Sequence, residues 1–333
     1  MVEQSVWDWL LEPADPGVRY LALRDLVGKA HDDPELVAAR QAAHELGPIA
    51  NVLDPMQPEG WWEKPGPGYG PKYRSTVWAL ILLAQLGASI DQDERVARAC
   101  TYMLDNALSE SGGFSCNRAP GGTFDCLQGN LCWALTTLGC EDPRLEKAYH
   151  WLAVSQTGEG LAPKNAKDTP MRYYAYKSGP NFTCGANYEL PCAWGATKVL
   201  LALGSIPPQK QTPQVQKAID LAVDFFFSVE PTTAAWPYKE KISSTWWQFG
   251  FPVFYNTDLL QVAEALVSVG YGADPRLAST LELIRSKQDA QGSWRLEHDY
   301  RNKTWGNYGK KGQPNKWVTL RALRVLQKAG LRS

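Results

Sequence analysis

The sequence predicts an all-α fold in which six helical hairpins close into an (α/α)6 toroid, with an inner and an outer ring of helices. Three observations support this. Apolar stretches end in glycine roughly every 60 residues, and a left-handed glycine is a common helix stop. Asp-Pro or Thr-Pro often marks the next start, because Pro is tolerated at the first helical position. Nearly wholly apolar helices alternate with amphipathic ones. The stop signals are Gly28, Gly87, Gly139, Gly204, Gly270 and Gly330.

The helices can be placed in chain order from these signals. Apolar helices that end at a stop signal are expected to be the inner ones, and amphipathic helices the outer ones. The inner helices are expected at 18–27, 75–86, 127–138, 193–203, 258–269 and 317–327. The outer helices are expected at 6–11, 35–46, 93–106, 143–155, 215–229 and 276–287. No hairpin of this kind can bury its apolar face alone, so residues 1–333 are expected to form a single domain.

Composition narrows the function classes. Hydrophobic residues make up 44% of the chain and the formal net charge is −1, so bulk charge does not suggest a nucleic-acid partner. No run of 18 apolar residues occurs and the first ten residues lack a basic signal-peptide start, so no membrane span or secretion signal is expected. Seven cysteines without such a signal indicate reduced thiols in the cytoplasm. The oligomeric state stays open.

Long loops that carry a Gly-aromatic element separate each outer helix from the next inner helix. The clearest runs from Gln288 through Gly292 to Trp294, in the form Q-x3-G-x-W. It resembles the QW repeat of squalene and oxidosqualene cyclases and is similar to repeats of protein prenyltransferase β subunits. The segments FGFPVFYNTDLL and KWVTLRALRVL resemble bacterial proteins that carry prenyltransferase or squalene-oxidase repeats. The resemblance implies an α/α toroid whose active cavity lies at the N-terminal pole of the inner helices.

Polar and thiol side chains gather around the starts of the inner helices, so this pole is the expected site. Helix N-termini favour negative charge and lower the pKa of a cysteine placed there. The candidate catalytic residues are Asp125, Cys126, Cys184, Cys192 and Asp258. The candidate substrate-binding residues are Lys72, Tyr73, Arg74, Tyr188, Tyr255, Asn256 and Trp317.

Asp125 is the candidate acid. In oxidosqualene cyclases an Asp-Cys pair begins the motif whose Asp protonates the substrate, and Asp125-Cys126 resembles that pair. The match stops there, since Leu127-Gln128-Gly129 replaces Thr-Ala-Glu and the D-x-D-D motif of squalene–hopene cyclases is absent. The alternative is that Asp125 is a helix N-cap, a position that Asp favours.

The thiols allow two chemistries. Cys126, Cys184 and Cys192, with Asp258 or Glu189, are a possible zinc ligand set, and protein prenyltransferases hold zinc with Asp, Cys and His in a similar barrel. Alternatively, Cys184 and Cys192 are similar to the cysteine pair that linalool dehydratase-isomerase uses for metal-free acid–base catalysis. The four remaining cysteines are interpreted as small buried hydrophobes. They are Cys100, Cys116, Cys132 and Cys140.

Other residues have one functional and one structural interpretation. Lys72 and Arg74 could clamp a carboxylate or phosphate, or form a charged loop rim. Aromatic pairs and triplets in the loops could wall an apolar ligand or anchor the loops. These aromatic residues are Tyr173, Tyr174, Tyr176, Trp246 and Trp247.

Three functions follow. The first is a cofactor-free acid–base enzyme, a lyase, isomerase or cyclase, that acts on an apolar small molecule such as an isoprenoid. The second is a zinc-thiolate enzyme that uses Cys126, Cys184 and Cys192. The third is a non-catalytic toroid that binds a ligand or a protein.

Overall fold

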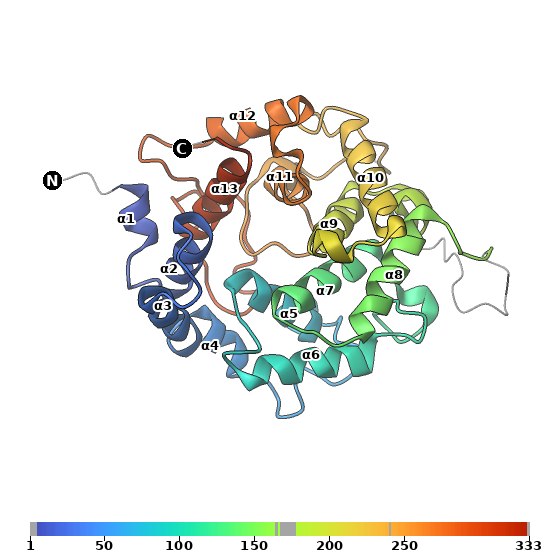
Figure 1. Ribbon diagram of the computed structural model, residues 1–333, viewed down its shortest axis with the longest axis horizontal. Coiled ribbons are helices and arrows are strands. Elements are labelled where there is room, and N and C mark those ends of the chain that lie inside the picture. Colours follow the sequence, from blue (N-terminus) through green and yellow to red (C-terminus); the bar gives the residue numbers. More distant parts are fainter. Residues whose placement is uncertain (1–4, 164–165, 167–177, 240, 332–333) are drawn as a thin grey trace.

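The computed structural model describes residues 5–163, 166, 178–239 and 241–331, and it confirms the (α/α)6 toroid (Figure 1). Six inner helices surround the centre of the ring, and the outer helices enclose them. The inner helices are α2 (Pro16–Ala22), α5 (Thr76–Leu86), α7 (Asp125–Thr137), α9 (Ala193–Gly204), α11 (Leu259–Ser268) and α13 (Lys316–Lys328). The outer helices are α1 (Val6–Leu10), α3 (Pro34–Glu45), α4 (Pro48–Leu53), α6 (Glu94–Ala107), α8 (Arg144–Thr157), α10 (Pro213–Phe227) and α12 (Ala278–Ser286).

Burial follows the expected alternation between rings. Every residue of the inner helix α5 except Gln85 is buried. The outer helix α6 buries one stripe, which includes Val96, Met103 and Leu104, and turns its charged residues to solvent. Among the described helices, none is both long and apolar enough to cross a membrane.

The Gly-aromatic element of the loops repeats in space as it does in sequence. Gly60 and Gly112 have φ values of 101° and 94°, which favour glycine. A Cβ at Gly60 would lie 2.7 Å from the carbonyl oxygen of Arg98, and one at Gly112 would lie 2.3 Å from that of Lys147. Both glycines therefore let the loop lie directly on the backbone of the next outer helix.

In three of these loops an aromatic residue ties the loop to the start of the inner helix that follows. Its backbone N–H donates a hydrogen bond to a side chain there, which satisfies a buried donor. The bonds run from Trp62 to Thr76 Oγ1 (3.2 Å), from Phe114 to Gln128 Oε1 (2.6 Å) and from Trp294 to Thr319 Oγ1 (2.9 Å). The repeated motif therefore fixes these loops to the inner helices by hydrogen bonds.

The last hairpin closes the ring against the first. Gln327 Nε2 of α13 donates to the carbonyl oxygen of Leu26 at 3.2 Å. At the opposite end of α13, Lys316 Nζ bonds Glu12 at 2.5 Å. The first and last hairpins therefore lie side by side (Figure 1).

Five of the six expected stop glycines are left-handed. Their φ values lie between 74° and 94°, and they are Gly28, Gly87, Gly139, Gly270 and Gly330. The interpretation of Gly204 as such a stop is wrong, because it is the last residue of α9. A Cβ there would lie 2.7 Å from Ser268 Oγ, so Gly204 is needed for the contact between α9 and α11.

Several short elements are absent from the sequence prediction. α4 adds a second outer helix to its hairpin, and α2 continues into a π-helical turn, Leu23–Val27. A small antiparallel pair, β1 (Thr183–Cys184) and β2 (Leu190–Pro191), precedes α9. This hairpin places Cys184 beside the start of α9.

Candidate functional site

A pocket of about 370 Å³ lies where the expected site was placed, at the N-terminal pole of the inner helices. Asp125 and Cys126 are the first residues of α7, and Cys192 is the N-cap of α9. Four thiols line the pocket, namely Cys116, Cys126, Cys184 and Cys192. Five aromatic side chains form much of the remaining wall, namely Tyr69, Phe124, Trp194, Tyr238 and Tyr255. The thiols that are distant in sequence therefore share one space, as expected.

Asp125 is a buried acid whose side chain does not cap its helix. Its side chain is 3% exposed, and Oδ1 accepts a hydrogen bond from Gln156 Nε2 at 2.9 Å. Oδ2 is buried and has no hydrogen-bond partner. The N-cap of α7 is Phe124, so the capping interpretation of Asp125 is wrong. Burial, reinforced by the neighbouring Cys184, raises the pKa of Asp125 well above its usual range despite the Gln156 donor.

Gln156 also fixes which oxygen of Asp125 carries the proton. Its Oε1 accepts the backbone N–H of Phe182 at 2.9 Å, so its amide group must donate to Asp125 Oδ1. An accepting Oδ1 leaves the proton of the neutral acid on Oδ2. A Cβ at Gly195 would lie 3.1 Å from Asp125 Cβ, so the glycine lets α9 pack closely against this side chain.

The pKa values of two pocket thiols are raised. Burial, with Cys184 and Asp125 close by, raises the pKa of Cys126 to about 12. A hydrogen bond to the Cys184 thiol, together with burial, raises the pKa of Cys192 well above its usual range. The expectation that helix N-termini lower these pKa values is wrong, because desolvation of the thiolate outweighs the helix field. None of the seven cysteines, all of which are described, forms a disulfide.

Lys72 and Tyr255 lie at the pocket as expected. Lys72 is exposed at the rim, with Nζ 4.5 Å from the ring centroid of Tyr255. Tyr255 contacts Trp194 with ring centroids 6.1 Å apart. Tyr73 lies behind this wall and does not line the pocket; its ring stacks on Tyr255 at 6.2 Å and packs on Tyr300 at 4.6 Å.

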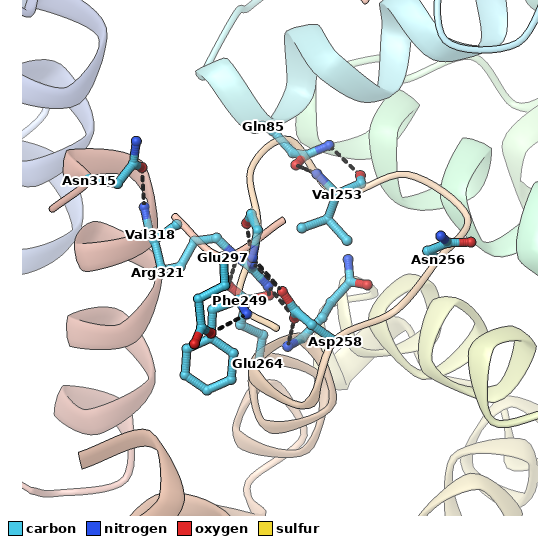
Figure 2. Close-up of polar contacts among 12 residues, drawn as sticks. Gln85, Phe249, Val253, Asn256, Asp258, Glu264, Glu297, Asn315, Val318 and Arg321 are labelled. Atoms are coloured by element: carbon cyan, nitrogen blue, oxygen red, sulfur yellow. Dashed lines mark hydrogen bonds and ion pairs between the residues drawn. The ribbon is translucent and has the colours of Figure 1, made fainter. Parts of the chain in front are cut away.

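Asp258 does not line the pocket, and its expected place among the thiols is wrong. Figure 2 shows it beside Arg321 instead. It is the N-cap of α11, where its Oδ1 accepts the N–H of Gln261 at 2.8 Å. Both oxygens also accept from Arg321, at 2.9 and 3.0 Å. Burial alone would raise the pKa of Asp258, but Arg321 holds it below its usual value. Arg321 also binds Glu264 at 2.9 Å, so Asp258 belongs to a buried ion-pair network.

Three more expected binding residues, all in loops, do not line the pocket. Arg74 pairs with Glu63 at 2.7 Å and so belongs to the loop rim. Asn256 contributes its carbonyl oxygen to Lys198 at 3.4 Å and does not line the pocket. Tyr188 is 64% exposed at the surface.

Trp317 and Trp246 pack against other parts of the protein and do not line the pocket. Trp317 stacks on Phe251 with ring centroids 4.6 Å apart. Trp246 is fully buried and its Nε1 donates to the carbonyl oxygen of Pro231, which makes it a loop anchor.

The interpretation of Cys116 as an inert core thiol is wrong, because it lines the pocket. Tyr173, Tyr174 and Tyr176 lie outside the described residues.

Sequence reasoning missed three residues that shape the site. Gln156 and Gly195 hold Asp125, and neither stands out in its helix. Lys198 is fully buried in α9, and its Nζ bonds Gln261 Oε1. Burial lowers the pKa of Lys198 to about 7, although Asp258 opposes this. A single lysine inside the apolar stretch AWGATKVLLALG was the sequence signal that could have found it.

Comparison with known proteins shows similarity at the level of solved structures. No protein-family model matches the chain, and no curated protein matches it. A family 76 glycoside hydrolase from a bovine Bacteroides thetaiotaomicron strain is 11% identical with a TM-score of 0.46, covering 98% of this chain and 69% of that one. A family 76 mannosidase from Bacteroides thetaiotaomicron is 10% identical with a TM-score of 0.41, covering 77% and 70%.

A terpene cyclase is also among the similar structures. The type II terpene cyclase MstE from Scytonema is 13% identical with a TM-score of 0.32, covering 88% of this chain and 97% of that one. At these identities and scores the likeness says nothing about activity. The toroid is established by the two helix rings of the chain itself.

Proposed function

We propose that this chain is a cofactor-free acid–base enzyme, a lyase, isomerase or cyclase, that acts on an apolar small molecule such as an isoprenoid. The observation that carries the proposal is Asp125 Oδ2, a buried and unpartnered carboxyl oxygen at an aromatic and thiol-lined pocket. A carboxyl group kept neutral near pH 7 is a usable general acid. We place the enzyme in the cytoplasm, where its thiols stay reduced.

In this mechanism Asp125 Oδ2 gives its proton to a double bond or a leaving oxygen of the substrate. The aromatic faces of Trp194 and Tyr255 stabilise the positive charge that develops, by attraction to the ring quadrupole. Loss of a proton from the neighbouring carbon then completes the reaction. The proton returns to the Asp125 carboxylate. The hydrogen-bonded thiols of Cys184 and Cys192 assist Asp125 in this proton transfer.

The test is deuterium exchange with a panel of isoprenoid alcohols and alkenes in D2O, followed by mass spectrometry. The wild type is expected to place deuterium in one substrate or its product. Asp125→Asn should abolish this incorporation while keeping the circular dichroism spectrum. Asp220→Asn, at an exposed carboxylate of α10, is the matched control and should retain activity. Unchanged activity of Asp125→Asn would remove this residue from the mechanism.

A zinc-thiolate enzyme is the second candidate function, because Cys126, Cys184 and Cys192 line one pocket. Within the described ranges, no group of three or more His, Cys, Asp or Glu side chains has an arrangement that could hold a metal ion. The raised pKa values of Cys126 and Cys192 also favour thiols over the thiolates that zinc binds. Elemental analysis of protein purified without chelator decides this, since stoichiometric zinc would replace the acid–base proposal.

A non-catalytic binding toroid is the third outcome of the same experiments. It would retain a panel ligand in the pocket without deuterium exchange, and Cys-to-Ser changes would leave that binding unchanged.

A further inference from the structure

A second cavity, of about 600 Å³, lies at the opposite pole of the ring and is called the C-pole chamber here. It is lined by the last turns of the inner helices, including Gln85 of α5 and Trp133 of α7. Phe251 and Val253 lie on its wall, whereas Tyr255 of the same loop lines the first pocket. Gln85 holds this loop by two hydrogen bonds to the backbone of Val253, both 2.8 Å (Figure 2). The loop thus contributes residues to two distinct cavities.

Positive charge is in excess on the wall of the C-pole chamber. Four cationic side chains line it, against the carboxylates of Asp25 and Glu264. The cationic side chains are Arg24, Arg321, Arg324 and Lys328. Arg321 is fully engaged, because it binds Asp258, Glu264 and a backbone carbonyl. Counting Asp258, which lies behind Arg321, the chamber still has more cations than carboxylates.

Part of this excess lies on Arg24 and Arg324, which share one carboxylate. Arg24 donates to both oxygens of Asp25, at 2.5 and 3.0 Å. Arg324 forms an ion pair with the same carboxylate. Arg324 Nε is buried yet has no hydrogen-bond partner. The Arg324 side chain is 25% exposed, so its guanidinium can also be reached from the chamber, and guanidinium groups bind carboxylates and phosphates well.

The remainder of the chamber wall is largely apolar. Leu21, Leu201, Val267 and Val325 surround the space on four different inner helices, and Trp133 adds an aromatic face. A cavity of this volume is in the range of small-molecule sites. The helix C-termini around it carry partial negative charge, so an anion binds here only through the arginines.

We propose that the C-pole chamber binds a single-chain amphiphile with an anionic head, a carboxylate or a phosphate. The head group lies against Arg324 and Arg24, and the chain lies along Trp133, Leu201 and Val267. This site is separate from the proposed active pocket and does not depend on the activity of Asp125.

The experiment titrates the full chain with decanoate, decyl phosphate, decanol and decyltrimethylammonium, by calorimetry and by tryptophan fluorescence. We expect saturable binding of at least one anion, at least tenfold tighter than that of decanol, with no binding of the ammonium compound. The ratio of decanoate to decyl phosphate identifies the head group. Equal binding of decanol, or stronger binding of the cation, would overturn the proposal.

Variants locate the binding. Arg324→Gln should weaken the anion at least tenfold, whereas Arg276→Gln, at a surface arginine, should not. Leu201→Trp fills the apolar side without changing charge and should also weaken binding, so it serves if Arg324→Gln fails to fold. Asp125→Asn should bind the anion like wild type, which separates this site from the first pocket. Unchanged anion binding in folded Arg324→Gln or in Leu201→Trp contradicts the proposal.

Discussion

Gln156 Nε2, on the outer helix α8, donates to Asp125 Oδ1 at the start of the inner helix α7, over 2.9 Å. The bond crosses between the two rings and leaves Oδ2 as the oxygen of Asp125 that carries the proton of the neutral acid. Because both side chains are buried, the pair keeps one orientation. The acid is thus positioned by a helix of the other ring.

We expect Asp125→Asn to stabilise the protein increasingly as pH rises. The folded pKa of Asp125 lies above the unfolded value of about 4, so only the unfolded chain loses its proton above that pH. Wild-type stability therefore falls between the unfolded and folded pKa values, by up to about 1.4 kcal/mol per pH unit, while the amide variant does not titrate. Urea unfolding of both proteins at pH 4, 5, 6 and 7 measures the difference. A constant difference would show that Asp125 ionises normally.

Lys198→Met tests the second buried ionisable group. Burial lowers the folded pKa of Lys198 to about 7, whereas the unfolded value is about 10.4. Between these values the unfolded chain binds the extra proton, so wild-type stability rises with pH there and the full penalty applies below pH 7. The variant should be more stable than wild type near pH 7, and its advantage should shrink by a few kcal/mol toward pH 10. Paired denaturation curves at pH 7 and pH 9.5 decide this, since a growing advantage would contradict it.

The ring of helical hairpins could be predicted from the sequence, but the contacts of the side chains inside it could not. Stop signals such as Gly87 and Gly270 work locally, through backbone conformation, so they can be located without the structure. Since the inner helices all start at one pole, the convergence of Cys126 with Cys192 was also predictable. Asp125 and Asp258 both stand at such starts, yet only the position of Arg321 on a distant helix decides which is paired.

The burial of individual side chains could not be predicted from the sequence either. The raised pKa of Cys126 and the lowered pKa of Lys198 depend on how much water reaches each group. That quantity is set by loops and helices from other repeats, so no local pattern could give it. The same holds for Gln156, whose role depends on the fold of the loop that contains Phe182.

Cys140 is expected to be more reactive than the pocket thiols Cys126 and Cys192, although the sequence suggested an inert one. A hydrogen bond from Cys100, against the opposing effect of burial, lowers the pKa of Cys140 to about 7. Because the thiolate is the nucleophile, Cys140 should be alkylated by iodoacetamide at pH 7.5 well before Cys126 or Cys192. Peptide mass spectrometry over time measures the order. Faster labelling of Cys126 would contradict the burial of the pocket thiols.

Removing the hydrogen-bond partner provides the control for this order. Cys100→Ala should slow the labelling of Cys140, because the thiolate loses its donor and its pKa returns toward the usual value. The same change lies in α6, away from the pocket, and should leave the labelling of Cys126 and Cys192 as in wild type. Equal slowing of all sites would instead indicate a general change in structure.

Gly129→Ala is expected to be severely destabilising, because Gly129 is where α7 and α9 touch. A Cβ there would lie 2.4 Å from both the carbonyl carbon and the carbonyl oxygen of Lys198, and backbone atoms cannot rotate away. Overpacking of this kind typically costs 1–3 kcal/mol or more, which exceeds the roughly 1 kcal/mol by which alanine improves a helix interior over glycine. Gly121→Ala is the matched control, because a Cβ there meets nothing within 4 Å. Thermal and urea unfolding of the two variants should separate them clearly. If Gly129→Ala left the free energy of unfolding unchanged, the backbones of α7 and α9 would not be in contact. The packing around Asp125 and Lys198, which depends on this contact, would then also be wrong.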